Sequence, residues 1–242
     1  MILDHGAFAH RGLWAPDGAP ENSIAAFQAA AAAGCGIELD VQLSSDNVPI
    51  VFHDPMLDRM TEKSGPVWFR TAEELSGVKL AGTDETIPTL SAVLTALPAG
   101  TPVLIEMKAS PGEPAEYLRA LDMAIFDAKA ELAIMSFLHP LNLAARQVMG
   151  THTRGALITP PTGLSSTGIA EKIATAENGT SPDYFAVWHS EAGAARAHLG
   201  TNIPLVAWTV DSPEALAGAK AAGASIIFEH LDPALVLEAV SS

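Results

Sequence analysis

Short apolar, β-rich runs alternate with alanine-rich helical segments along almost the whole chain. Several helical segments begin with Ser, Asp or Pro and end in Gly, the residues that favour helix starts and stops. This alternation is typical of β-α units that build a parallel sheet. The pattern predicts eight strands, at residues 7–10, 36–41, 102–107, 132–137, 154–159, 183–189, 204–210 and 225–230.

Eight strand–helix units in 242 residues match the size of a closed (β/α)8 barrel, the TIM barrel. The competing fold is an open, doubly wound sheet, which does not normally need eight units. In addition, no Gly-rich dinucleotide loop follows the first strand. We therefore predict an α/β fold, a TIM barrel that forms a single domain over residues 1–242.

One long segment, residues 42–89, interrupts the repeat. It starts with a turn at Asp46-Asn47 and a short returning strand, and continues as polar sequence with scattered aromatic residues. Long segments without their own regular structure are usually functional in compact domains. We predict an insertion after the second strand, at about residues 54–88, that acts as a lid or a specificity loop.

Charge and composition exclude several classes of partner. The chain has 28 acidic and 13 basic residues, a formal net charge of −15, which would repel nucleic acid and anionic lipid. The single cysteine, Cys35, rules out an internal disulfide and a cysteine-based zinc cluster. There is no apolar run of about 18 residues to span a membrane and no signal-peptide pattern, so we expect a cytoplasmic protein.

Acidic side chains gather at the predicted ends of two strands. Glu38 and Asp40 lie two residues apart on the second strand and therefore project to the same side, as Glu106 and Lys108 do on the third. In a barrel all four lie at the catalytic end. Three carboxylates there would repel one another unless a cation intervened, and oxygen ligands favour Mg²⁺, Ca²⁺ or Mn²⁺ over zinc. The alternative is that Glu38 or Glu106 pairs with Lys108 or Arg11.

Two histidines stand at comparable positions. His10 precedes Arg11 at the end of the first strand, and His53 precedes Asp54 at the end of the returning segment, so both rings could face one site. Histidine can accept or donate a proton near neutral pH, and the forked donors of Arg11 match phosphate oxygens. Asp54 could orient a ring or simply cap a loop. Together these residues indicate phosphoester chemistry.

Several motifs occur in a fixed order over nearly the whole chain: AHRG, PENSIAAFQAAAAAG, IELDV, VPIVFHD followed by LDRMT, IPTLSAVL, LIEMK, SF at 136–137 and AWTVD at 207–211. In this combination the chain resembles the glycerophosphodiester phosphodiesterase family, within the phospholipase C-like phosphodiesterase superfamily. The resemblance implies hydrolysis of small glycerophosphodiesters to sn-glycerol 3-phosphate and an alcohol. It leaves open whether water attacks directly or the glycerol hydroxyl first forms a cyclic phosphate.

The resemblance also assigns roles to individual residues. It implies that Glu38, Asp40 and Glu106 hold the divalent cation, with His10 as the proton acceptor and His53 as the proton donor. Arg11 and Lys108 would stabilise the phosphate. Trp208 would line the pocket, although a buried barrel tryptophan explains it equally well.

The chain departs from the family near the eighth strand. IIFEHLDP places Glu229 and His230 where an Ile-Thr-Asp-like stretch is usual, and we expect this to affect substrate preference more than catalysis. His230, and His189 after the sixth strand, could contact the substrate. The alternatives are a phospholipase D-like hydrolase of lysophospholipids or sphingomyelin, a non-catalytic barrel that binds phosphorylated polyols, and an unrelated metal-dependent aldolase or isomerase barrel. The sequence makes no prediction of head group or oligomeric state.

Overall fold

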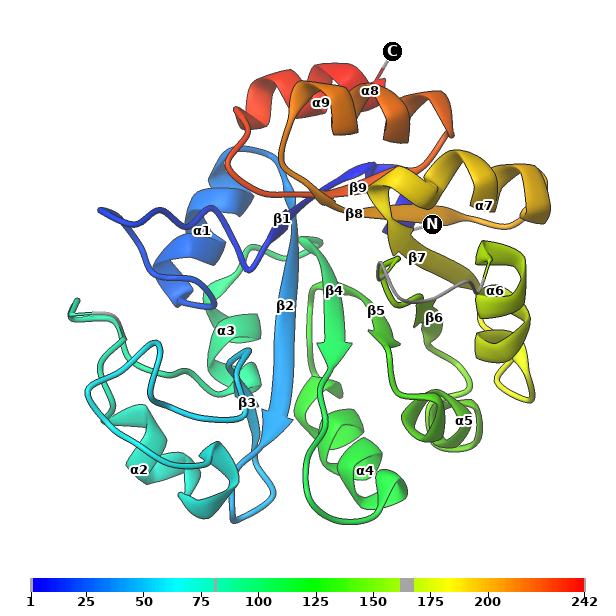
Figure 1. Cartoon of the computed structure of the whole chain (residues 1–242). Helices are drawn as coiled ribbons and strands as arrows, with labels where there is room; N and C mark the ends of the chain where they lie inside the picture. Colours follow the sequence, from blue (N-terminus) through cyan, green and yellow to red (C-terminus); the bar gives the residue numbers. More distant parts are fainter. Residues whose placement is uncertain (1, 81, 162–167, 242) are drawn as a thin grey trace.

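The computed structural model describes residues 2–80, 82–161 and 168–241. Within these residues the central feature is a closed barrel of parallel strands surrounded by helices (Figure 1). Strand β1 pairs with both β2 and β9, which closes the ring. The barrel strands are β1 (Ala7–His10), β2 (Gly36–Leu43), β4 (Pro102–Met107), β5 (Glu131–Ser136), β6 (Thr153–Leu157), β7 (Tyr184–Trp188), β8 (Leu205–Val210) and β9 (Ser225–Phe228).

The predicted TIM barrel is therefore confirmed, and all eight predicted strands are present with boundaries that differ by at most two residues. The helices lie outside the ring (Figure 1). Those that follow barrel strands are α1 (Ile24–Ala32), α3 (Leu90–Ala96), α4 (Pro114–Ile125), α5 (His139–Val148), α6 (Ile169–Glu177), α7 (Ala192–Leu199), α8 (Pro213–Ala221) and α9 (Pro233–Ser241). Short 3-10 helices are η1 (Ile2–His5), η2 (Val67–Phe69) and η3 (His189–Glu191).

Helix starts follow the local sequence. Ser23, Thr89 and Ser212 each accept a hydrogen bond from the backbone N–H three residues later, which satisfies one of the free N–H groups at a helix start. None of the described helices is long and apolar enough to cross a membrane.

Apolar side chains form two layers, one inside the barrel and one between the barrel and its helices. The inner layer includes Phe8, Leu104 and Tyr184, and η1 adds Ile2 and Leu3 to it. A side chain at Gly155 would place its Cβ 2.2 Å from the Tyr184 ring, so glycine makes room for this large residue. The interior is thus a packed core, as in other barrels of this size.

The long segment after β2 begins as predicted, with strand β3 (Pro49–Val51) antiparallel to β2. The description of the rest as polar sequence with scattered aromatic residues is incomplete, because apolar residues of the segment form a separate buried cluster around the short helix α2 (Ala72–Ser76). They are spaced irregularly and therefore give no helix or strand period in the sequence. The cluster consists of Ile50, Phe52, Leu57, Val67, Leu75, Val78, Leu80 and Ile87, and residue 81 lies outside the described residues.

Candidate active site

The register of adjacent strands brings the predicted acidic residues together. Asp40 on β2 lies opposite Glu106 on β4, and Glu38 lies opposite His10 on β1. One carboxylate oxygen from each of Glu38, Asp40 and Glu106 lies within 4.8 Å of the others. All three side chains are buried, so the predicted convergence is confirmed.

Two cationic side chains lie against this carboxylate cluster. The Lys108 ammonium nitrogen is 3.0 Å from Asp40 Oδ1 and 2.6 Å from Glu106 Oε1. Arg11 Nε is 3.4 Å from Asp40 Oδ2. The ion-pair alternative therefore holds for Glu106, and Asp40, which it did not include, is paired as well. Glu38 instead accepts the backbone N–H of Arg11 at 3.2 Å, and its carboxylate lies 4.0 Å from His10 Nε2.

The cluster carries more negative charge than these cations neutralise. Three carboxylates face two cations, so the five groups have one net negative charge when all are ionised. Burial, and then the charge of Asp40, raises the pKa of Glu106 to about 7 and that of Glu38 well above its ordinary value. Burial would also raise the pKa of Asp40, but Lys108 and Arg11 outweigh it and lower that pKa.

A hard divalent cation fits this set of donors. The oxygens are those that Mg²⁺ or Ca²⁺ prefers, and added positive charge would favour the ionised forms of Glu38 and Glu106. It would also turn the net charge of the group positive, the sign that attracts a phosphodiester.

The turn after His10 is built for close packing. Arg11 has a φ of 58° and Gly12 a φ of 83°. A Cβ at Gly12 would lie 2.7 Å from the backbone of Ala26, so only glycine fits here. The turn lets the Arg11 backbone reach Glu38 while its side chain reaches Glu21 at 2.9 Å.

The loop before α1 contributes two buried residues that were not predicted as site residues. Asn22 donates from Nδ2 to Asp40 Oδ2 at 2.8 Å, and its Oδ1 accepts the Asp40 backbone N–H at 3.3 Å. Glu21 pairs with Arg11. The PENS motif of the sequence contains both residues, but it was used only as part of the family resemblance.

His53 is held by the residue that follows it. Its Nδ1 lies 2.7 Å from Asp54 Oδ1, so Asp54 does contact the ring, as one of the two predicted options required. Arg59 of the insertion extends the network, with Nε 2.5 Å from Asp54 Oδ2 and Nη2 2.6 Å from Glu21 Oε1. Burial lowers the pKa of His53. The charge of Asp40 opposes this shift, and the charges of Lys108 and Arg11 add to it. Arg59 was not predicted, although the LDRMT motif contains it.

His10 is held by a residue from the other end of the chain. Its Nδ1 contacts Glu229 Oε2, and Glu229 Oε1 lies 3.0 Å from His230 Nε2. The expectation that this departure affects substrate preference more than catalysis did not include a contact with His10. The feature of the sequence that could have indicated this contact is the departure itself, which places Glu229 at the end of the last strand.

All predicted site residues except Asp40 line one cavity of about 140 Å³. Its polar wall consists of His10, Arg11, Glu38, His53, Glu106 and Lys108, and Asp40, which does not line it, forms an ion pair with Lys108. The rest of the lining, its apolar wall, includes Phe137 and Trp208, whose rings meet edge to face with their centroids 5.2 Å apart. His189 contacts Trp188 at 4.9 Å and does not line this cavity, and His230 lines a neighbouring one with Trp14.

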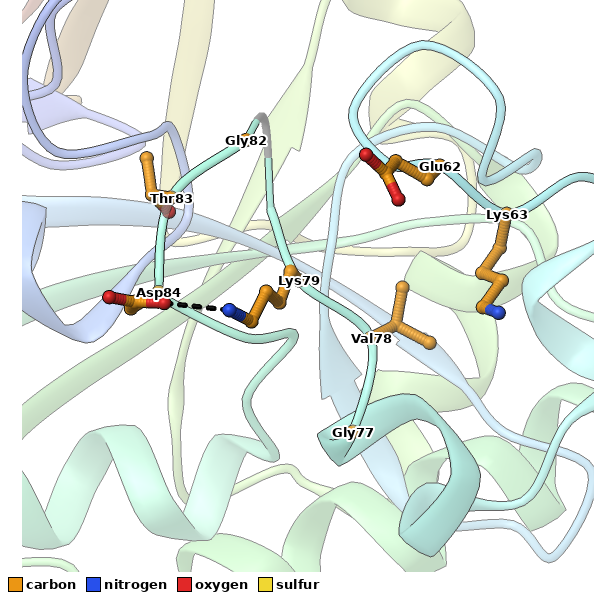
Figure 2. A pocket seen from close by; sticks show the side chains of 8 residues that line it. All are labelled: Glu62, Lys63, Gly77, Val78, Lys79, Gly82, Thr83 and Asp84. Atoms are coloured by element: carbon orange, nitrogen blue, oxygen red, sulfur yellow. Dashed lines mark hydrogen bonds and ion pairs between the residues drawn. The ribbon is translucent and has the colours of Figure 1, made fainter.

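A larger hollow of about 550 Å³ lies in the insertion (Figure 2). Its lining includes Glu62, Lys63 and an exposed ion pair between Lys79 and Asp84 at 2.7 Å. None of the predicted site residues lines it among the described residues. The size of a cavity therefore does not mark the chemical site in this molecule.

Fold and site together define a TIM barrel with a cluster of carboxylates and two histidines at one end. The family model of the glycerophosphoryl diester phosphodiesterase family matches residues 10–231. The chain belongs to this family, and the resemblance seen in the sequence is confirmed.

Individual relatives are similar over parts of the chain. Human glycerophosphodiester phosphodiesterase 1 is 32% identical over 172 residues, which cover 67% of this chain and 51% of the human protein. A Caldanaerobacter subterraneus glycerophosphodiester phosphodiesterase is 46% identical over 91 residues, covering 34% of this chain and 36% of that protein. The chain thus spans about half the length, or less, of these relatives.

Solved structures share the fold over nearly the whole chain. An Oleispira antarctica phosphodiesterase, solved in complex with the product sn-glycerol-3-phosphate, has a TM-score of 0.80 at 21% identity, covering 97% of this chain and 96% of that one. A Thermotoga maritima glycerophosphodiester phosphodiesterase has a TM-score of 0.73 at 24% identity, with 97% and 95% covered. At these identities the likeness concerns the fold.

Proposed function

We propose that this protein hydrolyses glycerophosphodiesters to sn-glycerol 3-phosphate and an alcohol with the help of a divalent cation. The observation that carries the proposal is the small cavity that His10, His53, Arg11, Lys108 and two members of the carboxylate cluster, Glu38 and Glu106, line together. Family membership and the names of the relatives support it.

Phosphate binding falls to the polar wall. Arg11 and Lys108 would stabilise the anionic phosphate, and Glu38, Asp40 and Glu106 would hold Mg²⁺, Ca²⁺ or Mn²⁺. When bound, the cation neutralises phosphate charge and polarises the phosphorus–oxygen bond. The apolar wall, with Phe137 and Trp208, would accept the carbon-bearing part of the substrate.

Proton transfer falls to the two histidines. His10 takes the proton from the attacking hydroxyl, either of water or of the glycerol itself, and His53 gives a proton to the leaving alcohol oxygen as its bond to phosphorus breaks. If a cyclic phosphate forms first, water opens it with the two roles exchanged. Asp54 on Nδ1 and a bound anionic phosphate both favour the imidazolium form of His53 that donation needs.

Two predictions from the sequence accompany this proposal. A cytoplasmic location fits a substrate that is a small molecule. The organisation as a single domain over residues 1–242 fits a site whose residues come from the first to the last barrel strand.

Release of glycerol 3-phosphate from a panel of glycerophosphodiesters tests the proposal. The panel includes glycerophosphocholine and glycerophosphoethanolamine, with Mg²⁺, Mn²⁺ or Ca²⁺ added and with excess EDTA. We expect release that depends on the metal and identifies the head group. Release of choline from lysophosphatidylcholine or sphingomyelin, with no glycerol 3-phosphate from the panel, would instead favour the phospholipase D-like alternative. Binding without turnover of any diester would favour a non-catalytic barrel.

A further inference from the structure

We propose that Glu229 is a positioning residue that fixes the proton of His10 on Nδ1 and so keeps Nε2 free to accept a proton. Its Oε2 contacts His10 Nδ1, while His10 Nε2 lies on the side of the carboxylate cluster, 4.0 Å from Glu38 Oε2. In a neutral imidazole only one nitrogen carries hydrogen, so a carboxylate on Nδ1 selects that tautomer. The kinetic part of this inference rests on the proposed function.

Glu229 is well placed for this role because it is itself held in position. Its backbone N–H donates to the carbonyl of Val210 at 3.0 Å, which ties the end of β9 to β8. The second carboxylate oxygen lies 3.0 Å from His230 Nε2, and the His230 ring packs edge to face on Trp14 at 4.6 Å. Both carboxylate oxygens are therefore engaged, and a turn of the carboxylate away from His10 would break the contact with His230 as well.

The carboxylate also remains charged near neutral pH. Burial would raise the pKa of Glu229, but the hydrogen bond with His10 and the nearby positive groups outweigh it and lower that pKa. An ionised carboxylate accepts only, so it can bond only to a protonated Nδ1. In catalytic groups of this kind, loss of the carboxylate charge allows the wrong tautomer and reduces turnover with little change in geometry.

The test combines a spectrum with kinetics in Glu229→Gln and Glu229→Ala. We expect ¹⁵N imidazole spectra of the wild-type protein to show His10, assigned with His10→Ala, protonated on Nδ1. In both variants the proton is free to occupy Nε2. We expect kcat to fall by about 10- to 100-fold, as for other partners of functional histidines, with KM changed by less than about threefold. Mg²⁺ affinity by calorimetry should stay within about threefold, because Glu229 is not in the carboxylate cluster.

Glu191→Gln provides a matched control. Glu191 also follows a barrel strand, its side chain is 15% exposed against 21% for Glu229, and it pairs with Lys172 at 3.0 Å instead of with a histidine. This variant should keep kcat and the His10 spectrum of the wild type.

An unchanged His10 tautomer in both Glu229 variants, or an equal loss of kcat in Glu191→Gln, would overturn the inference. If the wild-type protein hydrolyses no diester, the proposed function fails. The tautomer spectra then still decide the role of Glu229, because they do not depend on turnover.

Discussion

Each of the two proposed catalytic histidines contacts a carboxylate, but the two carboxylates come from different parts of the chain. His53 bonds through Nδ1 to Asp54, the next residue in the chain, whereas His10 bonds through Nδ1 to Glu229, 219 residues away. Each imidazole thus has one nitrogen on a carboxylate, and both line the same cavity. The same local geometry can therefore come from a loop or from the closure of the whole barrel.

The two halves of the site, His53 with Asp54 and His10 with Glu229, also differ in how their carboxylates are held in place. Asp54 lies in a network of charges with Arg59 and Glu21, anchored by the insertion. Glu229 is supported by His230, whose ring is 46% exposed, and by the strand-end hydrogen bond to Val210. We expect the His53 half to depend on ion pairs of the insertion and the His10 half on the pairing of the first and last strands.

The largest expected effect tests whether both rings are needed. His10→Ala and His53→Ala should each reduce kcat for glycerophosphodiesters by about 10²- to 10⁴-fold, the usual contribution of a general acid or base. Neither side chain fills the core, with 17% and 32% exposed, so circular dichroism and the melting temperature should change little. A rate like that of the wild type in either variant would exclude the two-histidine mechanism.

A substrate with a better leaving group sharpens this comparison. The p-nitrophenolate group leaves a phosphodiester without needing a proton. With a p-nitrophenyl phosphodiester as substrate we therefore expect His53→Ala to recover much of the wild-type rate, whereas His10→Ala does not. The opposite pattern would mean that the acceptor and the donor have been assigned the wrong way round.

The partner of His53 should matter about as much as that of His10. Asp54→Asn keeps the shape of the side chain but removes the charge that holds the ring, so kcat should fall by about 10- to 100-fold. Steady-state kinetics of Asp54→Asn and Glu229→Gln, measured side by side, compare the contributions of the two carboxylates to kcat. An effect of Asp54→Asn on KM alone would show that Asp54 is merely a loop cap.

The carboxylate next to His10 tests the metal assignment. Glu38→Gln removes a charged ligand from the cluster, and we expect the affinity for Mg²⁺ or Ca²⁺ to fall by about tenfold or more, about 1.4 kcal/mol. Isothermal titration calorimetry measures this without turnover. Unchanged affinity would falsify the assignment of Glu38 as a ligand.

The smallest expected effect concerns the support of the His53 half. In Arg59→Ala the buried Glu21 keeps Arg11 but loses its second partner, so the free energy of unfolding should fall by about 1 kcal/mol. Although burial opposes it, Arg59 and Arg11 lower the pKa of Glu21 below its ordinary 4.5. The ionised form of Glu21 therefore stabilises the fold above pH 4.5, and this contribution is lost as the pH falls through the lowered pKa. Urea unfolding at pH 7 and in acid should show a difference between wild type and variant that narrows in acid. A difference independent of pH would point to lost packing.

Much of the site followed from two periodicities in the sequence. Residues two apart in a strand share a side, so Glu38 and Asp40 were expected together, and parallel strands end at one rim, so Glu106 and Lys108 were expected beside them. The contact between His53 and Asp54 was within reach because the two residues are neighbours. These predictions hold because strand geometry and parallel pairing are local rules.

Two features of the insertion depended on tertiary contacts that have no local pattern. The insertion has its own core because irregularly spaced apolar residues meet only when the segment folds back on itself. Arg59 reaches Glu21 only because the insertion lies over the loop before α1.

By itself, the sequence determined the barrel, the end of it that carries the candidate site and the chemical types of the site residues, since strand period and motif order are properties of neighbouring residues. The tertiary structure alone decided that Glu229 supports His10. That contact exists because β9 closes the ring against β1, and the pairing of the first and last strands joins residues that no local pattern connects.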